Sequence, residues 1–244
     1  MDNDQLPRLE VCLSPSLLHL YDLSQSIVVI IDVLRATSTI CTALFNGATR
    51  VIPVNSVAKC IEIGNQLQAV TAGERDGHIA PGLSHGNSPF EYTPGFIGGK
   101  TLVLTTTNGT KLLHMSCNAL QIITGSFPNL SAVCDYLVQQ KQHVLLGCAA
   151  WKDLVNLEDT IFAGAVVHHT REHFAHHCDA ALMAEGLYLQ ARNDLFGYMK
   201  NASHFKRLSG YGLEKDIRYC LSPDVANVLP VYHNGELVLL NQDA

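Results

Sequence analysis

The sequence predicts an α/β protein of three layers, in which a mostly parallel or mixed sheet lies between two layers of helices. Segments of strand length alternate with segments of helical spacing over the first 150 residues. The segment Ile27–Leu34 begins with five consecutive β-branched residues, as expected of a strand buried on both faces. Near the C-terminus, Asn234-Gly235 separates two apolar runs and predicts a β-hairpin. These three observations define the fold class.

The elements of the first half follow from apolar runs and from the segments between them. The expected strands are Ile27–Leu34, Arg50–Val54, Gln68–Ala72, Thr101–Thr105, Ala119–Ile123 and His143–Ala149. The expected helices are Ser38–Asn46, Ser56–Gln66, Gly109–Ser116 and Asn129–Gln140. Residues 73–99 interrupt the alternation with many glycines and prolines, and a segment of this length inside a compact domain indicates an ordered functional loop.

The pattern changes after Ala150. Long helices are expected over Leu157–His173 and Asp179–Arg192, with a third over Asp194–Leu208. Strand-like segments follow at Ile217–Leu221, Leu229–Tyr232 and Glu236–Leu240, the last two forming the hairpin. We therefore expect one domain over residues 1–244, with a helical subregion and a closing hairpin within a possible subdomain at 150–244.

Composition and charge narrow the classes of function. Apolar residues make up 47% of the 244 residues, and a net charge of −6 argues against a nucleic-acid partner. The acidic N-terminus does not resemble a signal peptide, and no apolar run reaches the length of a membrane span, so we expect a cytoplasmic protein. The eight cysteines form no C-x-x-C pair and are expected to be reduced. A homodimer is expected only because twofold symmetry is common among oligomers.

Polar residues follow the expected strands where ligands bind in open α/β sheets. Asp32 and Arg35 come after the first buried strand, where Asp32 could ligate a metal and Arg35 could bind a phosphate. An ion pair between Asp32 and Arg35 beside a helix cap is the simpler interpretation. Because parallel strands end at a common edge, Glu74 and Thr105–Asn108 are expected to converge with Asp32.

Two further segments have both a functional and a structural interpretation. Thr106-Thr107-Asn108-Gly109 offers hydroxyls and backbone N–H groups at a helix start, which suits an anion but also an ordinary N-cap. Glu158 and Asp159 are candidate ligands, although acidic residues also suit the first turn of a helix electrostatically.

Several blocks together resemble the 2-phosphosulfolactate phosphatase family over nearly the whole chain. They are Asp32-Val-Leu-Arg35-Ala-Thr-Ser-Thr, Gly73-Glu74-Arg75, Gly86-Asn87-Ser88-Pro89, Thr106-Thr107-Asn108-Gly109-Thr110, Leu157-Glu158-Asp159-Thr160-x-x-Ala-Gly164, His204-Phe205, Gly210, Asp216-Ile217-x-x-Cys220 and Asp224. The resemblance implies a Mg²⁺-dependent phosphatase that hydrolyses (R)-2-phospho-3-sulfolactate to 3-sulfolactate and phosphate, a step of coenzyme M biosynthesis. The resemblance implies a glycine or another small residue in the segment after Trp151, but this chain has Lys152-Asp153-Leu154-Val155-Asn156, a departure that concerns the local loop and the fit of the substrate.

The chemistry of phosphate-ester hydrolysis then assigns roles to these residues. Asp32, Arg35 and Glu74 are the expected catalytic residues. The candidate Mg²⁺ ligands are Asp32, Glu74, Glu158 and Asp159. The substrate, a small phosphorylated sulfonate or carboxylate, is expected to contact Arg35, Ser38, Arg75, Asn87, Thr106, Thr107 and Asn108. The spacing does not distinguish attack by a carboxylate from attack by a water molecule.

Other interpretations remain open at this stage. The same site could act on another small acidic phosphoester, such as phosphoglycolate or phospholactate, or could belong to a non-catalytic anion-binding module. The pairs His169/His173 and His173/His177 have the i,i+4 spacing of a zinc site, but surface or interface positions are more common for such residues. Cys148 lacks the surroundings of a phosphatase cysteine loop and is expected to be a buried structural thiol. Trp151 either lines the pocket or packs in the core.

Overall fold

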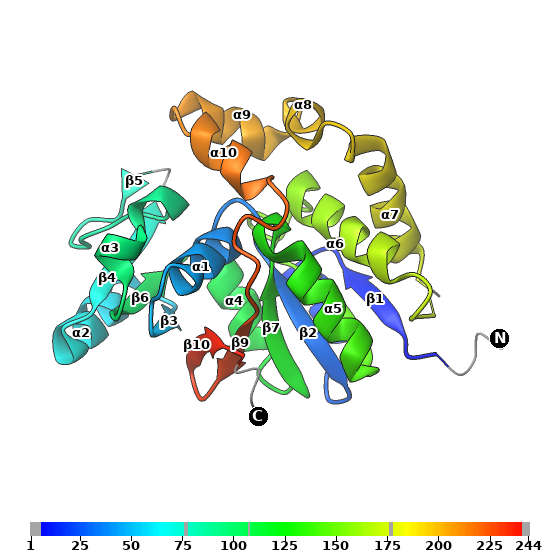
Figure 1. The fold of residues 1–244 in the computed structure, drawn as a ribbon, viewed down its shortest axis with the longest axis horizontal. Helices are drawn as coiled ribbons and strands as arrows, with labels where there is room; N and C mark the ends of the chain where they lie inside the picture. Colours follow the sequence, from blue (N-terminus) through cyan, green and yellow to red (C-terminus); the bar gives the residue numbers. More distant parts are fainter. Residues whose placement is uncertain (1–5, 76–77, 107, 176–177, 241–244) are drawn as a thin grey trace.

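The computed structural model describes residues 6–75, 78–106, 108–175 and 178–240, and it has the three-layer α/β architecture (Figure 1). The strands are Leu9–Cys12 (β1), Ser26–Ile31 (β2), Arg50–Val54 (β3), Val70–Arg75 (β4), His78–Ile79 (β5), Thr101–Thr105 (β6), Gln121–Gly125 (β7), His143–Cys148 (β8), Pro230–His233 (β9) and Glu236–Leu239 (β10). The α-helices are Ala36–Phe45 (α1), Val57–Leu67 (α2), Pro94–Ile97 (α3), Gly109–Met115 (α4), Leu130–Gln140 (α5), Leu157–Thr170 (α6), Asp179–Ala191 (α7), Leu195–Met199 (α8), Ser203–Gly210 (α9) and Glu214–Cys220 (α10).

The strands form one mixed sheet in the order β1-β8-β2-β7-β9-β10-β3-β6-β4-β5. Strands β1, β8, β2 and β7 are mutually parallel, and so are β3, β6 and β4. The C-terminal hairpin lies between the two groups and is antiparallel to both β7 and β3. It pairs only near the amino ends of these strands, at Ile122 and Ile123 of β7 and at Val51 of β3. The hairpin expected from Asn234-Gly235 is therefore present, but it joins two half-sheets rather than closing an edge.

The central strand β2 is buried on both faces because its side chains alternate between two cores. Ile27, Val29 and Ile31 pack in one core with α5, α6 and α7. Val28 and Ile30 pack in the other with residues of α1 and α4. This two-sided burial explains the uninterrupted β-branched run, and it fixes Asp32 at the end of a rigid element.

Two predictions for the C-terminal third are wrong. The segment Asp194–Leu208 is not one helix, because α8 ends at Met199 and α9 starts at Ser203. The segment predicted as strand Ile217–Leu221 lies mostly in helix α10, where Ile217 and Cys220, three residues apart, are both buried. In Figure 1, α8, α9 and α10 lie together above the sheet, so this region forms a helical cap.

Two further segments differ from the sequence prediction. The edge strand β1 was not predicted, and it pairs in parallel with β8. Residues 73–99 contain β5, the 3₁₀ turn Pro89–Glu91 and α3. This segment is thus built from short elements.

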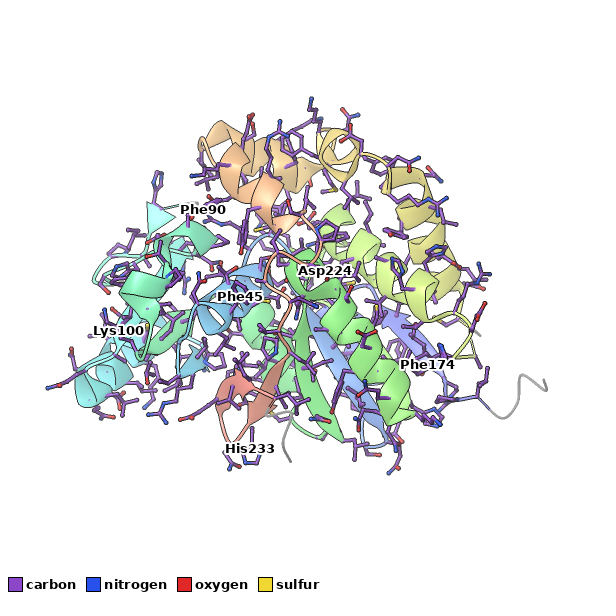
Figure 2. The ribbon with its side chains drawn as sticks, viewed as in Figure 1. Phe45, Phe90, Lys100, Phe174, Asp224 and His233 are labelled. Carbon is purple, nitrogen blue, oxygen red and sulfur yellow. The ribbon has the colours of Figure 1, made fainter. Side chains whose placement is uncertain are left out.

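The segment that leads from the cap to the hairpin is fastened to α5. Asp224, labelled in Figure 2, accepts hydrogen bonds from the backbone N–H and the hydroxyl of Ser131, at 2.8 and 2.7 Å. A carboxylate at the first turn of a helix satisfies donors that have no partner within the helix. In the described part of the chain, no helix is long and apolar enough to cross a membrane.

Candidate active site

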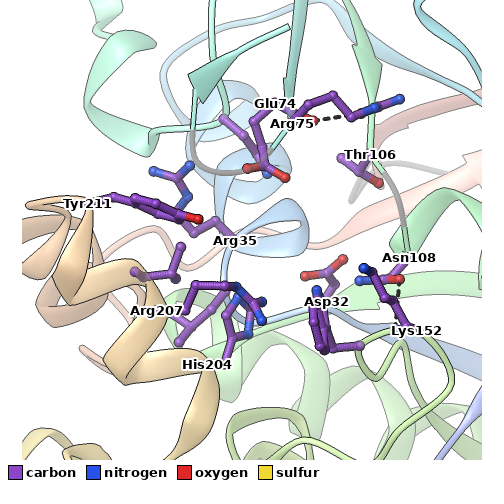
Figure 3. A pocket seen from close by; sticks show the side chains of 14 residues that line it. Asp32, Arg35, Glu74, Arg75, Thr106, Asn108, Lys152, His204, Arg207 and Tyr211 are labelled. Carbon is purple, nitrogen blue, oxygen red and sulfur yellow. Dashed lines mark hydrogen bonds between the residues drawn. The ribbon is translucent and has the colours of Figure 1, made fainter.

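A cavity of about 270 Å³ lies where β2, β4, β6 and β8 end, beneath the helical cap (Figure 3). Its walls are Asp32, Leu34, Arg35, Glu74, Arg75, Asn87, Thr106, Asn108, Trp151, Lys152, His204, Arg207, Leu208 and Tyr211. Asp32, Glu74, Thr106 and Asn108 therefore converge as expected, whereas Thr105 is fully buried and does not line the cavity. The predicted reason for this convergence, that all the strands are parallel and end at one edge, is wrong. The hairpin between β7 and β3 is antiparallel to both, so the two groups of parallel strands run in opposite directions.

Asp32 follows β2 and directs its carboxylate into the cavity (Figure 3). Its Oδ2 accepts a hydrogen bond from the Gly109 N–H at 3.0 Å, and its Oδ1 accepts one from the Ala36 N–H at 3.4 Å. Both donors lie at helix N-termini, which favour a negative charge. Gly109 permits this approach, since a Cβ there would lie 2.9 Å from Oδ2. Burial nevertheless dominates and raises the pKa of Asp32 to about 6, while His204 lowers it in part.

Glu74 ends β4 on the opposite wall, and Figure 3 shows its carboxylate directed into the cavity toward Asp32. Arg75 follows it, and its Nη1 donates to the backbone carbonyl of Glu74 at 2.6 Å. In Figure 3 the Arg75 side chain runs along the upper rim. Two carboxylates therefore face each other across a cavity whose walls also carry cations.

Arg35 immediately precedes α1, and its guanidinium forms an ion pair with Asp216 of α10. Both side chains are buried, with 4% and 8% of their surface exposed. The ion-pair interpretation was therefore right about pairing but wrong about the partner, which is Asp216 and not Asp32. Because Asp216 comes from the cap, this contact joins the cap to the end of the first strand while Arg35 still lines the cavity.

Glu158 and Asp159 lie beneath the cavity rather than in its wall, and both are fully buried. Asp159 accepts hydrogen bonds from the Val33 N–H at 2.9 Å and the Ala150 N–H at 3.2 Å. Asp159 therefore joins Val33, which follows β2, to Ala150, which follows β8. Burial, together with the nearby Glu158 and Asp32 carboxylates, raises the pKa of Asp159 well above its usual range.

Glu158 has a different contact. One of its carboxylate oxygens meets Nδ1 of His204 from α9, and the same oxygen accepts from Asn156 Nδ2 at 3.1 Å. Its other oxygen, Oε2, has no hydrogen-bond partner among the described residues. Since Glu158 engages Nδ1, the other ring nitrogen of His204 is the one left for the cavity.

The remaining predicted contacts differ in their placement. Ser38 does not line the cavity, because it is fully buried in α1 and donates to the Val33 carbonyl at 2.8 Å. Thr106 lines the cavity, but its hydroxyl contacts Thr110 Oγ1 at 3.0 Å and accepts from the Thr110 N–H. Asn108 lines the cavity, whereas Thr107 lies outside the described residues. Asn87 lines the cavity, and its Oδ1 is buried with no partner in the described part of the chain.

The sequence prediction missed the contribution of α9. His204, Arg207, Leu208 and Tyr211 all line the cavity, and the spacing of three, four and seven residues places them on one face of the helix. This spacing was a usable signal, but it was hidden within a longer segment predicted as one helix. The cap thus contributes a histidine, an arginine and a tyrosine to the site.

Trp151 lines the cavity, which resolves the question left open by the sequence. Its ring carries the Arg207 guanidinium at 4.0 Å and the Lys152 ammonium at 4.7 Å from a ring centroid. Contacts of this kind hold a cation without occupying its N–H donors. Two cations therefore lie against one ring at the cavity wall, and these contacts leave their N–H donors available.

The candidate metal ligands do not form one cluster. In the described ranges, no group of three or more His, Cys, Asp or Glu side chains is arranged to hold a metal ion. Asp32 and Glu74 share the cavity, while Glu158 and Asp159 lie below it. Of the histidines with i,i+4 spacing, His169 contacts the Tyr188 hydroxyl at 3.1 Å, His173 follows the end of α6, and His177 lies outside the described residues.

Cys148 is a structural thiol, as predicted. It is fully buried, and burial raises its pKa well above the ordinary value for a thiol. It does not line the cavity.

The protein is thus an α/β protein whose cavity has acidic, basic and amide side chains, a composition that suits a small polar ligand. The model of the 2-phosphosulpholactate phosphatase family matches residues 12–235 of this chain. The chain therefore belongs to the 2-phosphosulfolactate phosphatase family.

Curated relatives support this assignment. A probable 2-phosphosulfolactate phosphatase of Thermotoga petrophila is 42% identical over 86% of this chain and 91% of its own length. The protein of the same name from Caldanaerobacter subterraneus subsp. tengcongensis is 38% identical over 91% of this chain and 93% of its own. A third, from Synechocystis sp., is 39% identical over 83% and 87%. The similarity thus covers both the sheet and the cap.

Proposed function

We propose that this protein is a Mg²⁺-dependent phosphatase that hydrolyses (R)-2-phospho-3-sulfolactate to 3-sulfolactate and phosphate. The observation that carries the proposal is the cavity in which Asp32 and Glu74 face each other among Arg35, Arg75 and Arg207. The names of the relatives support the choice of substrate. The resemblance of the chain to the family supports a role in coenzyme M biosynthesis, and we propose that the protein acts in the cytoplasm.

The donor set fits a magnesium ion. Mg²⁺ is commonly held by one or two carboxylates together with water and substrate phosphate oxygens, so a cluster of three protein ligands is not required. Asp32 and Glu74 would hold it, because both carboxylates enter the cavity. Burial raises the pKa of Asp32 and so disfavours its charge in the protein alone, and a bound cation would offset this effect. When bound, the ion would supply positive charge near the phosphoryl oxygens.

The other groups of the wall bind and orient the ester. The free N–H donors of Arg35 and Arg75 suit phosphate oxygens, and the Arg35–Asp216 pair holds one guanidinium in a fixed plane. The Asn87 and Asn108 amides supply further polar contacts. In the reaction, a water oxygen forms a bond to phosphorus, the bond from phosphorus to the C2 oxygen breaks, and a proton reaches that oxygen.

His204 is placed to take part in that proton movement. Glu158 engages its Nδ1, which fixes the orientation of the imidazole ring at the wall of the cavity. A ring held in this way presents Nε2 to a bound ester, where it can carry the proton to the leaving oxygen.

The test is phosphate release from phosphosulfolactate, phospholactate and phosphoglycolate, each with Mg²⁺ and with EDTA. We expect release that depends on Mg²⁺ and is fastest with the sulfonated ester. Asp32→Asn should abolish it, while Asp22→Asn, a change of the same kind at an exposed position, should not. Release only from other esters would reassign the substrate. A folded protein that releases no phosphate from any ester would be an anion-binding module, contrary to the proposal.

A further inference from the structure

We propose that Arg207 and Lys152, both held against Trp151, bind the second acidic group of the substrate and set its specificity. The enzyme would then select phosphate esters that carry a further strong acid and would discriminate against plain alkyl phosphates. This inference rests on the proposed phosphatase function and assigns a receptor for the part of the substrate that does not react.

The first argument is that these two cations are available to a ligand. Arg35 has one guanidinium nitrogen committed to Asp216, and Arg75 donates to the Glu74 carbonyl. Neither Arg207 nor Lys152 has a carboxylate within ion-pair distance among the described residues. Their contacts are with an aromatic ring, which leaves their N–H groups free to bind oxygen.

The second argument is that the wall around Trp151 is built to hold its shape. Trp151 and Leu154 exchange two backbone hydrogen bonds, of 2.9 and 3.0 Å, across a turn whose central residues both have positive φ. Those residues, Lys152 and Asp153, are not glycines, so the conformation is costly and must be imposed by its surroundings.

Three contacts impose it. The Asp153 carboxylate pairs with Lys111 at 2.7 Å, and the Asp153 carbonyl accepts from the Ser14 hydroxyl at 2.7 Å. The Lys152 N–H donates to Asn108 Oδ1 at 3.4 Å (Figure 3). A receptor held in place before binding loses little conformational entropy when the ligand arrives.

The third argument is the balance of charge. A divalent ion held by Asp32 and Glu74 would neutralise these two carboxylates, and Asp216 offsets Arg35. Arg75, Lys152 and Arg207 then leave three positive charges in the wall. A phosphate monoester supplies two negative charges at most, so the excess favours an ester with an additional acid.

In Figure 3, Arg207 and Lys152 lie on either side of Asp32, one from the cap and one from the turn after β8. A ligand whose phosphate lies at Asp32 can therefore reach either cation with a neighbouring acidic group. Since Arg207 comes from α9, binding of that group also joins the cap to the sheet.

The test compares three esters: phosphosulfolactate, phospholactate, which lacks the sulfonate, and isopropyl phosphate, which lacks both acids. Arg207→Met and Lys152→Met should each lower kcat/KM for phosphosulfolactate by about 10- to 100-fold, the usual loss for a hydrogen bond to a charged group. For isopropyl phosphate, kcat/KM should fall by less than about threefold in either variant, because this ester has no second acid for the two cations to bind. Lys206→Met is the matched control, since Lys206 is exposed on the same helix and does not line the cavity.

The arms of the experiment separate the two acids. If kcat/KM falls only with phosphosulfolactate, the cations bind the sulfonate. If it falls equally with phospholactate, they bind the carboxylate. An equal loss with isopropyl phosphate would overturn the proposal. Arg207→Lys, which keeps the charge, should recover part of the loss.

A binding measurement keeps the inference testable apart from turnover. Titration calorimetry with 3-sulfolactate should show weaker binding to Arg207→Met than to the wild type, whereas inorganic phosphate should bind both alike. If the wild type releases no phosphate, the proposed function fails, but weaker binding of 3-sulfolactate to the variant would still support the receptor. Equal binding of 3-sulfolactate to both proteins would overturn it.

Discussion

Replacing Asp32 by Asn should remove activity and at the same time stabilise the fold above neutral pH. Asp32 is half-buried in the cavity wall, and desolvation raises its pKa from 3.8 to about 6. A carboxyl whose pKa is raised by folding destabilises the native state wherever it is ionised. The wild type therefore loses stability as the pH rises from about 4 to about 6, and the cost stays constant above that range.

The magnitude follows from the shift. About two pKa units at 1.36 kcal/mol per unit give a cost of about 3 kcal/mol at pH 8. Asn keeps one acceptor oxygen but loses the second, so one of the hydrogen bonds from Gly109 and Ala36 is lost, at about 1 kcal/mol. The expected net gain is about 2 kcal/mol at pH 8, or about 4 to 8 °C in Tm for a chain of this size.

The assay is thermal and urea unfolding of wild type and Asp32→Asn in EDTA, at pH 8 and pH 4.5. The stability gain of Asp32→Asn over the wild type should be near zero at pH 4.5, because most of the free-energy cost of the ionised Asp32 carboxylate is absent at that pH. The exposed Asp22→Asn should show no such gain. Lower stability of Asp32→Asn at pH 8, or a gain that does not depend on pH, would refute the reasoning.

Magnesium should reduce or reverse the difference in stability between Asp32→Asn and the wild type. An ion at one hundred times its dissociation constant stabilises the binding protein by about 2.7 kcal/mol. We expect this rise in the wild type and not in Asp32→Asn, so the Tm difference between them should narrow or change sign when Mg²⁺ replaces EDTA.

Two other predictions concern packing and the buried ion pair. Asp216→Ala leaves the Arg35 guanidinium buried without its partner and should cost about 3 to 5 kcal/mol in urea unfolding, together with a higher KM; a loss below about 1 kcal/mol would argue against the pair. Gly164→Ala would place a Cβ 1.9 Å from the Ala184 carbonyl oxygen, so α6 and α7 must separate, and we expect a loss of more than about 3 kcal/mol or no folded protein. Gly186→Ala on α7 meets nothing within 4 Å and should stabilise by up to about 1 kcal/mol; similar losses for both glycine variants would contradict this account.

The first half of the chain could be predicted closely because its signals are local. The run Ile27–Ile31 alternates between two cores, and only β-branched strand residues satisfy both. The hairpin signal Asn234-Gly235 was equally local, since both residues adopt the positive φ that such turns require.

The cap could not be predicted in the same way. The segment at Ile217–Leu221 has too few residues for its period to separate a strand from a helix, and tertiary burial of Ile217 and Cys220 decides for the helix. The break between α8 and α9 depends on how the chain turns to bring His204 over the cavity.

The sequence by itself determined the fold class, the family resemblance and the strand-end residues Asp32 and Glu74, because these depend on local composition and order. Only the tertiary structure decided which side chains share the cavity. It paired Arg35 with Asp216, gave Asp159 a fastening role under the site, and brought Arg207 to Trp151. Such contacts join residues far apart in the chain, and no local pattern specifies them because packing of the cap on the sheet sets the distances.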